Sequence, residues 1–319
     1  MVGVPVFMAY NLGADSTLDT PKKQMAFLAT APVSTNTNNG RVYGGRYQWG
    51  RANLPYAISS DGNYTLYDGA VNSISLEALI PASYDSNGQI IGQDNNHVYV
   101  RYSATGSGTF DWRGGESSPV RQDDLWDKNG GTKAGSLSPS KSVNDPCPSG
   151  WRAPTQDEWE RLCIYDCDHT TAGGVMGLSG SVPFISDGVA ETNTGFTWVA
   201  VVCSGGVCYK NADWENKGQT PSGYNSGYAV YRSDVWNDSS WDKSNLISPS
   251  APEPFLFLPA EGCRSYGSGT VNYVGTYGYY WSSTTNGSNA YYLSFGYNRI
   301  ATQANSYRDY GYAVRCVKE

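Results

Sequence analysis

The last fifty residues constrain this chain most, because a large excess of tyrosine is combined there with an alternating pattern. Between Tyr266 and Tyr312 the chain holds 11 of its 25 tyrosines, where an even spread would place roughly four. Asn, Ser, Gly, Thr and Asp separate them, and two framework-like segments, Gly278–Thr284 and Ala313–Val317, interrupt the pattern. Tyrosine offers a large amphipathic contact area at low rotamer cost, and small polar residues offer adaptable hydrogen bonds. This composition favours a binding surface; the alternative is a sheet that uses tyrosine for its β propensity.

The stretch Ala290–Gly296 predicts a strand with two different faces, because successive side chains of a strand point to opposite sides. One face is apolar and suits a core, whereas the other is polar or aromatic and suits solvent. The core-facing residues are Tyr291, Leu293 and Phe295, and the solvent-facing residues are Tyr292, Ser294 and Gly296.

Composition excludes several classes of protein. The chain has 319 residues, 39% hydrophobic residues and a mean hydropathy of −0.47, which indicates a modest core and abundant loops. Its formal net charge of −7 and its few lysines argue against non-specific nucleic-acid binding and against docking on anionic lipid. No apolar run approaches the span of a bilayer. The start, Met1–Val6, lacks the basic and apolar regions of a signal peptide.

Local signals predict a few elements. Pro5–Tyr10 is expected to form a first strand, and Lys22–Leu28 a short helix after a proline start. Thr155 and Glu158 form a capping box that predicts a second helix. The apolar run Phe255–Pro259 fits a buried central strand that ends at the proline.

Residues 164–250 are expected to be irregular and polar, with one hairpin. Valine-rich runs flank Gly205 and Gly206, and a two-residue turn there would place Cys203 opposite Cys208. Cα atoms at such a pair lie near enough for a disulfide, with two free thiols as the alternative. The chain has seven cysteines, so at least one has no partner within it.

Five short motifs lie in order along the chain. They are Tyr47–Arg51, Asn144–Thr155, Phe257–Ala260, Tyr280–Thr284 and Val314–Val317. In this order they resemble the major paralogous domain of many surface proteins of gut and rumen bacteria. The resemblance implies an α+β domain with a C-type-lectin-like fold, of the branch that includes formylglycine-generating-enzyme-like domains. That fold has two helices, twisted antiparallel sheets and long loops that form a ligand-binding face. On this basis we expect a single domain over residues 1–319, with a large loop-rich insertion around residues 164–250.

The tail, residues 260–319, also resembles the variable regions of diversity-generating retroelements. In those systems template adenines are mutagenised during copying, so that asparagine codons become codons for Tyr, Asn, Ser, Asp or Gly around a fixed framework. The resemblance implies that this region is variable and binds the ligand. The implied ligand-binding positions are Tyr266, Tyr273, Tyr277, Tyr279, Tyr292, Ser294, Gly296, Tyr297, Asn298, Tyr307, Asp309 and Tyr310.

The resemblance to the major paralogous domain bears on two further cysteines. Cys147 and Cys316 lie in two of the matching motifs, and in the implied fold the C-terminal strand runs near the start of the second helix. The resemblance therefore implies that they pair or at least contact each other.

Two segments resemble metal sites, but each lacks part of the ligand set. Trp236–Asp238 matches the calcium-binding tripeptide of sugar-binding C-type lectins, but the required upstream triplet is missing, and Glu253–Phe255 lies downstream without an amide ligand. A surface turn fits Trp236–Asp238 better. Cys163, Cys167 and His169 could approach a zinc ion, but a fourth ligand is lacking, and a helix end with buried or paired cysteines is the alternative. We expect no metal and no cofactor.

An enzyme of the formylglycine-generating type would need a reactive cysteine pair. Cys263 is followed by the cation Arg264, but no second cysteine is near it in sequence. Neither a nucleophile elbow nor a phosphate-binding loop is present in the sequence. We therefore expect no enzyme activity.

The expected function is non-enzymatic ligand binding, as an adhesin or receptor-binding module. The partner would be a protein or glycan on another cell, virus or host surface, without nucleic-acid binding or direct membrane insertion. The alternatives are a structural surface or pilus domain whose tail packs on its neighbours and, less favoured, a formylglycine-generating-type enzyme. The expected location is extracellular, at the cell surface or on a phage virion.

Overall fold

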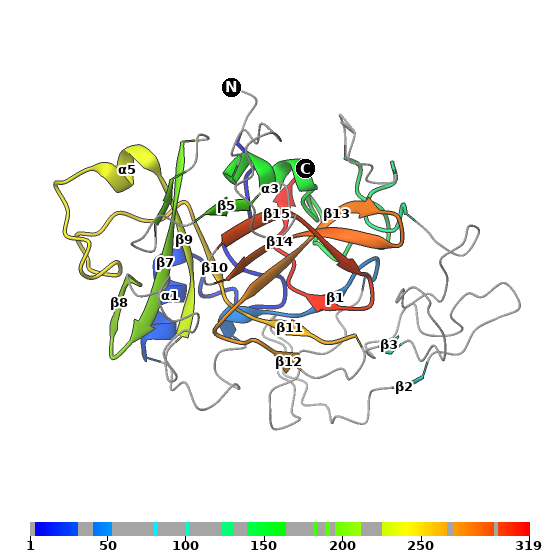
Figure 1. The fold of residues 1–319 in the computed structure, drawn as a ribbon, viewed down its shortest axis with the longest axis horizontal. Helices are drawn as coiled ribbons and strands as arrows, with labels where there is room; N and C mark the ends of the chain where they lie inside the picture. The colour runs from blue at the N-terminus through cyan, green and yellow to red at the C-terminus, as the bar shows by residue number, and fades with distance from the viewer. Residues whose placement is uncertain are drawn as a thin grey trace, which may run out of the picture.

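In the computed structural model, the chain forms mainly β-strands, arranged in several separate sheets with short helices beside them (Figure 1). The structure describes residues 4–30, 41–52, 80–81, 100–101, 123–129, 139–163, 181–183, 189–191, 195–211, 225–266, 271–296 and 299–319.

The first sheet has the strand order β10-β9-β7-β6, with β8 also paired to β7, and all of its pairs are antiparallel. Its central strand β7 is buried on both faces because apolar residues follow one another without alternation. Trp198 packs into one core cluster, whereas Val199 packs with Met25 of helix α1 into another. The bounds are α1 Pro21–Thr30, β6 Val189–Glu191, β7 Phe196–Ser204, β8 Val207–Lys210, β9 Asn225–Arg232 and β10 Leu256–Pro259.

The second sheet, β13-β14-β15-β5, contains most of the tyrosine-rich tail and is antiparallel throughout. The predicted alternation of β14 is confirmed from Tyr291 to Phe295: Tyr291, Leu293 and Phe295 are buried, whereas Tyr292 and Ser294 are half-buried on the other face. Gly296, which was expected to face solvent, is buried instead. The bounds are β5 Ser181–Pro183, β13 Gly278–Asn286, β14 Asn289–Gly296 and β15 Arg299–Tyr307.

A third antiparallel sheet, β1-β16-β11-β12, is joined to the second sheet by backbone hydrogen bonds. Trp281 N–H donates to the Ala313 carbonyl at 3.0 Å, and Ala313 N–H donates to the Tyr279 carbonyl at 3.0 Å. These two bonds join β13 to the residue that follows β16. The bounds are β1 Tyr47–Gln48, β11 Cys263–Arg264, β12 Val271–Asn272 and β16 Gly311–Tyr312.

The remaining described elements are short. The strands β4 and β17 pair antiparallel, and β2 pairs with β3 in parallel. The predicted capping box is confirmed: Thr155 N–H donates to Glu158 Oε2 at 2.8 Å, and Glu158 N–H donates to Thr155 Oγ1 at 3.3 Å. None of the described helices is both long and apolar enough to cross a membrane. The bounds are β2 Ile80–Pro81, β3 Val100–Arg101, β4 Trp151–Arg152, α3 Gln156–Cys163, α5 Ser233–Asn237 and β17 Val317–Lys318.

Tryptophans of two of the sequence motifs bind each other's strands. The indole of Trp49 donates to the Ser282 carbonyl at 2.9 Å, and the indole of Trp281 donates to the Tyr47 carbonyl at 2.8 Å. Both indoles are fully buried. A buried indole N–H needs a partner, so each hydrogen bond fixes the position of the opposite strand.

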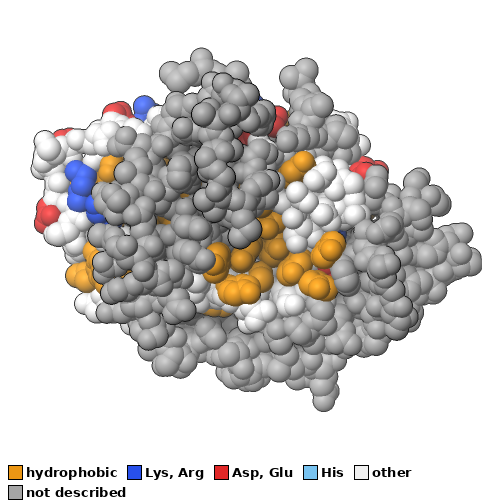
Figure 2. Space-filling model, in the orientation of Figure 1, with side chains coloured by type: hydrophobic (Ala, Val, Ile, Leu, Met, Phe, Trp, Pro, Cys, Tyr) orange, Lys and Arg blue, Asp and Glu red, His pale blue; other side chains and the backbone are white. Residues whose placement is uncertain are grey.

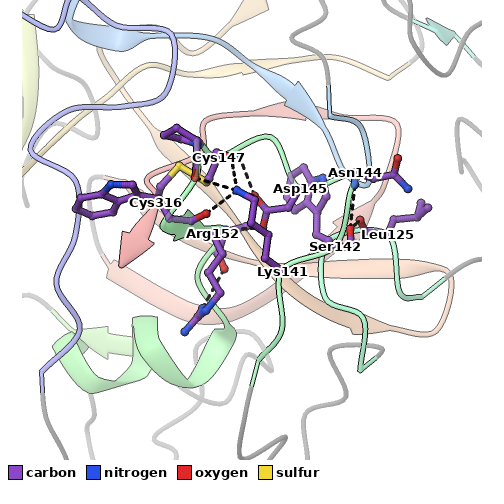
Figure 3. A network of polar contacts seen from close by, with 12 residues as sticks. Leu125, Lys141, Ser142, Asn144, Asp145, Cys147, Arg152 and Cys316 are labelled. Carbon is purple, nitrogen blue, oxygen red and sulfur yellow. Dashed lines mark hydrogen bonds and ion pairs between the residues drawn. A yellow bond between two sulfur atoms is a disulfide. The ribbon is translucent and has the colours of Figure 1, made fainter. Parts of the chain in front are cut away.

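The disulfide that the resemblance implied between Cys147 and Cys316 is present, with its Cα atoms 5.9 Å apart. Figure 3 shows it beside the ammonium group of Lys141, which donates to the carbonyl oxygens of Cys147, Pro148 and Trp151, the last at 2.6 Å. Asp145 accepts the N–H groups of Cys147 and Ala153, each at 2.8 Å. One cation and one carboxylate therefore organise the loop that carries this disulfide.

The second disulfide lies in the hairpin that the valine-rich runs predicted. Cys203 and Cys208 are register partners in β7 and β8, and they are bonded with their Cα atoms 4.2 Å apart. The turn uses Gly205 and Gly206 at φ of 59° and 82°, a left-handed conformation that suits glycine.

The expected α+β, C-type-lectin-like fold is wrong. The structure is mostly β, with several separate antiparallel sheets, and the described helices do not form the clear two-helix arrangement of that fold. The capped helix α3 has only 8 residues and α1 only 10. The residues of the motifs that suggested the lectin fold make individual core contacts, such as Trp49 with Ser282, and contacts of that kind do not determine how sheets are arranged.

Three smaller expectations also need correction. Pro5–Tyr10 makes only an isolated bridge, between Phe7 and Val317, and is not a strand. Strand β10 is buried, but it lies at an end of the described first sheet and not at its centre. Residues 164–250, expected to be irregular apart from one hairpin, also contain β5, β6 and the long strand β9.

Candidate functional site

Seven of the predicted ligand-binding residues, which we call the tyrosine cluster, form two groups of ring contacts that Tyr312 joins into one set. It consists of Tyr266, Tyr273, Tyr277, Tyr279, Tyr292, Tyr307 and Tyr310. Its members come from strands and turns of the second and third sheets. Of the other predicted positions, Tyr297 and Asn298 lie outside the described residues.

The centre of the cluster rests on Tyr312, which is buried in β16. Its ring centroid lies 5.0 Å from that of Tyr279, 4.8 Å from that of Tyr292 and 5.4 Å from that of Tyr310. Beneath it, the fully buried ring of Trp281 lies at 4.3 Å. Tyr312 and Trp281 therefore form an aromatic base that connects the two sheets.

Two arms extend from this base. On one side Tyr310 contacts Tyr266 at 5.0 Å, and Tyr266 contacts Tyr307 at 5.7 Å. On the other side Tyr279 contacts Tyr277 at 6.0 Å, and Tyr277 contacts Tyr273 at 5.4 Å. Such edge and stacked arrangements are the geometries that aromatic rings prefer, so each ring holds its neighbour in place.

The tyrosine cluster is partly open to solvent. Six members are half-buried, and Tyr273 is 57% exposed. Figure 2 shows hydrophobic side chains gathered near the middle of one face, over the region where β14 and β11 lie in Figure 1.

The charged side chains that the structure describes in the segments carrying the cluster are turned inward. Between residues 261 and 316, every charged side chain that the structure describes is buried. These residues are Glu261, Arg264, Arg308, Asp309 and Arg315. Burial also raises the pKa of the Tyr279 and Tyr310 phenols far above the ordinary value, so both stay neutral.

Three predicted positions lie outside the open cluster. Ser294 is half-buried and is the register partner of Tyr279. Gly296 is buried beneath the ring of Tyr277, where an added Cβ would come within 2.4 Å of a ring carbon. Asp309 is fully buried, and its carbonyl accepts a hydrogen bond from Gln48 at 3.0 Å. Gly296 and Asp309 therefore cannot present a side chain to a ligand in this arrangement.

Sequence reasoning missed a buried polar group beneath the tyrosine cluster. Glu261 Oε1 accepts the backbone N–H of Tyr279 at 2.8 Å, and Arg46 donates to the Glu261 carbonyl oxygen. Desolvation raises the pKa of Glu261 to about 8, although the hydrogen bond from Tyr279 and the charge of Arg46 act in the opposite direction. A single Glu beside apolar residues was the only signal, and sequence alone does not reveal whether such a residue is buried.

The residues considered above for catalysis and for metal binding lie in different parts of the chain. Cys263 is a free, buried thiol, and desolvation raises its pKa to about 12. Trp236 is buried in α5, and Asp238 accepts the Ser240 N–H at 2.8 Å, as in a turn. Cys167 and His169 lie outside the described residues. Within the described part of the chain, no three His, Cys, Asp or Glu side chains are placed to hold a metal ion.

A comparison with protein families finds a match in the C-terminal part of the chain. Residues 227–317 are similar to a family described as a domain of unknown function (DUF8237). No curated protein and no solved structure shows a significant match to the chain. The matched segment runs from β9 to β17, so it contains the whole tyrosine cluster together with Trp281, Tyr312 and Glu261.

Proposed function

We propose that this chain is a non-enzymatic binding module that captures its ligand on the tyrosine cluster. The observation that carries the proposal is the set of seven half-buried or exposed tyrosine rings joined through Tyr312, in segments whose described charged side chains are buried. The ligand is a protein or glycan on another cell, virus or host surface. Such an aromatic surface suits an uncharged patch of the partner. A charged group of the partner would lose its hydration there without gaining an opposite charge in return.

The energetics of such a surface are favourable. Burying one tyrosine ring contributes on the order of 1.5–3 kcal/mol before ordering costs. The rings of Tyr279, Tyr292 and Tyr310 are already packed on Tyr312, so they lose little conformational freedom when a ligand binds. A few preorganised rings at the centre of an interface can therefore dominate its affinity.

The state of Cys263 supports a non-enzymatic role. A reactive cysteine requires an accessible thiolate, whereas this thiol is buried and its pKa is raised to about 12. The adjacent Arg264 is itself buried and has not activated the thiol.

The disulfides support an extracellular or cell-surface location, or a phage virion, because such bonds persist mainly in oxidising surroundings. We also propose that the cluster positions are the replaceable ones of a retroelement-diversified tail, supported on the fixed residues Trp281 and Tyr312. A reverse-transcriptase gene and an asparagine-codon-rich near copy of the tail in the neighbouring DNA would support this. Their absence from the complete genome would contradict it.

The binding role can be tested with two substitutions that leave the aromatic base intact. Tyr273→Ser and Tyr310→Ser, singly and combined, are compared with Tyr209→Ser in β8, outside the cluster. The probes are an array of immobilised glycans and a panel of intact bacterial and host cells. We expect the cluster variants to fold and to lose capture at least about tenfold, the effect of about 1.4 kcal/mol, while the β8 variant retains it. Intact capture in the double variant contradicts the proposal, and loss of folding or assembly favours a structural domain.

A further inference from the structure

The segment Glu261–Cys263 runs directly beneath the tyrosine cluster and binds its backbone at two successive points. Gly262 N–H donates to the Tyr277 carbonyl at 2.8 Å, and Glu261 Oε1 accepts the Tyr279 N–H at 2.8 Å. Only glycine fits at the middle of this segment, because Gly262 has a φ of 69° and an added Cβ would come within 2.1 Å of the Asn272 carbonyl oxygen. The position of Tyr279, which contacts the base and one arm, therefore depends on the Glu261 side chain.

Glu261 is an unusual residue for this role, because it is fully buried. Its second oxygen, Oε2, is also buried and receives no well-aligned hydrogen bond from a described residue, although the Tyr280 hydroxyl lies close to the carboxyl group. The nearby guanidinium of Arg46 donates instead to the backbone carbonyl of Glu261. A carboxylate in this place would carry a charge with incomplete compensation, whereas the protonated acid would not.

Other polar groups near Glu261 are already engaged. The hydroxyl of Tyr280 donates to the Pro259 carbonyl at 2.7 Å. The guanidinium of Arg315 donates to three oxygens, those of the Asn11 side chain and of the Met8 and Phe257 backbones. The titratable and charged groups that face Glu261 from all the packed segments are Tyr43, Arg46, Cys263, Tyr279, Tyr280 and Arg315.

We propose that Glu261 is the positioning residue of the tyrosine cluster, and that its bound proton holds the cluster in the arrangement described above. When the proton leaves, the buried carboxylate attracts water or the Arg46 guanidinium, and the segment from Tyr277 to Tyr279 loosens. Burial places the Glu261 pKa at about 8 and the phenol pKa of Tyr279 far higher, so this change precedes ionisation of that ring. Only the consequence for ligand capture rests on the proposed function.

The test measures near-ultraviolet circular dichroism of the intact protein from about pH 6 to about pH 9.5. We expect the aromatic signal to lose amplitude with a midpoint near pH 8 in the natural chain. Glu261→Gln keeps the acceptor for Tyr279 and cannot ionise, so it should retain the signal throughout. Glu319→Gln, at an exposed glutamate, should behave like the natural chain. A flat signal in the natural chain, or the same transition in Glu261→Gln, overturns the proposal.

A second measurement needs no Glu261 variant and so does not depend on how that variant folds. In protein labelled with ¹⁵N-tyrosine, the amide resonance of Tyr279, assigned with Tyr279→Phe, should shift with a midpoint near pH 8. An amide that does not move over this range overturns the proposal. Neither measurement uses a ligand, so the proposed function can fail while the role of Glu261 stands, and the reverse is equally possible.

Discussion

The ring of Tyr279 stacks on that of Tyr312, with 5.0 Å between centroids and 19° between planes. The two residues belong to different sheets, β13 in the second and β16 in the third. The candidate binding surface is therefore built where two sheets meet, and its aromatic base also holds that junction together. Substitutions in the arms of the tyrosine cluster should affect binding, whereas substitutions in the base should affect folding as well.

Tyr273 should show a conflict between stability and binding. It has a φ of 63°, a left-handed conformation that is costly for a tyrosine, and it is 57% exposed. Asparagine tolerates this conformation better, so Tyr273→Asn should raise the free energy of unfolding by about 0.5–1 kcal/mol while weakening capture. Urea unfolding measures the first effect, with Tyr266→Asn as the matched control. A loss of stability in Tyr273→Asn would mean that ring contact with Tyr277 outweighs the backbone strain.

Lys141 should be important for the stability of the loop that carries Cys147. Its ammonium group donates to three carbonyl oxygens and lies 3.6 Å from Asp145 Oδ1. Lys141→Met keeps the apolar stem but leaves these acceptors without their donor, so we expect a loss of about 3 kcal/mol in the free energy of unfolding. Lys128→Met, at an exposed lysine, should change it by less than about 0.5 kcal/mol. Similar effects of the two substitutions would refute the role of Lys141.

The two disulfides should contribute unequally to stability. Their cysteines are 169 residues apart for Cys147–Cys316 and 5 apart for Cys203–Cys208. The loop-closure relation then gives stabilisations of about 5 and about 2 kcal/mol. Paired alanine substitutions of each bridge, followed by urea unfolding, measure both values. Equal losses would show that effects other than unfolded-chain entropy dominate.

Stability should fall as pH rises through the range in which Glu261 titrates. The folded state raises the pKa of this carboxyl from 4.5 to about 8, so the folded chain holds a proton that the unfolded chain has released. Its contribution is full below about pH 4.5, declines by about 1.4 kcal/mol per pH unit, and is lost above about pH 8.

The difference between the natural chain and Glu261→Gln isolates this term, because other titrating groups are common to both. Urea unfolding at several pH values should show the natural chain losing stability relative to the variant between neutral pH and pH 8. A constant difference over that range would mean that Glu261 is ionised in the folded protein.

Local features of this protein could be predicted from sequence because they depend on neighbouring residues. The alternation in β14, the capping box of Thr155 and Glu158, and the hairpin that joins Cys203 to Cys208 each follow from backbone geometry over a few residues. The pairing of Cys147 with Cys316 was implied only through a resemblance, and it too is present.

The tertiary structure alone decided which side chains are buried and how the sheets meet. Tyr312 became the base of the tyrosine cluster, Asp309 turned inward, and Glu261 was placed beneath Tyr279. The sheets also differ from the expected lectin-like arrangement, because they are separate and antiparallel. These outcomes depend on contacts between segments far apart in the chain, such as Trp49 with Ser282. Each such contact forms only when the rest of the fold brings its two segments together. A short motif indicates which neighbouring residues pack well together. Whether a charged residue such as Glu261 is buried depends instead on all the segments that pack around it.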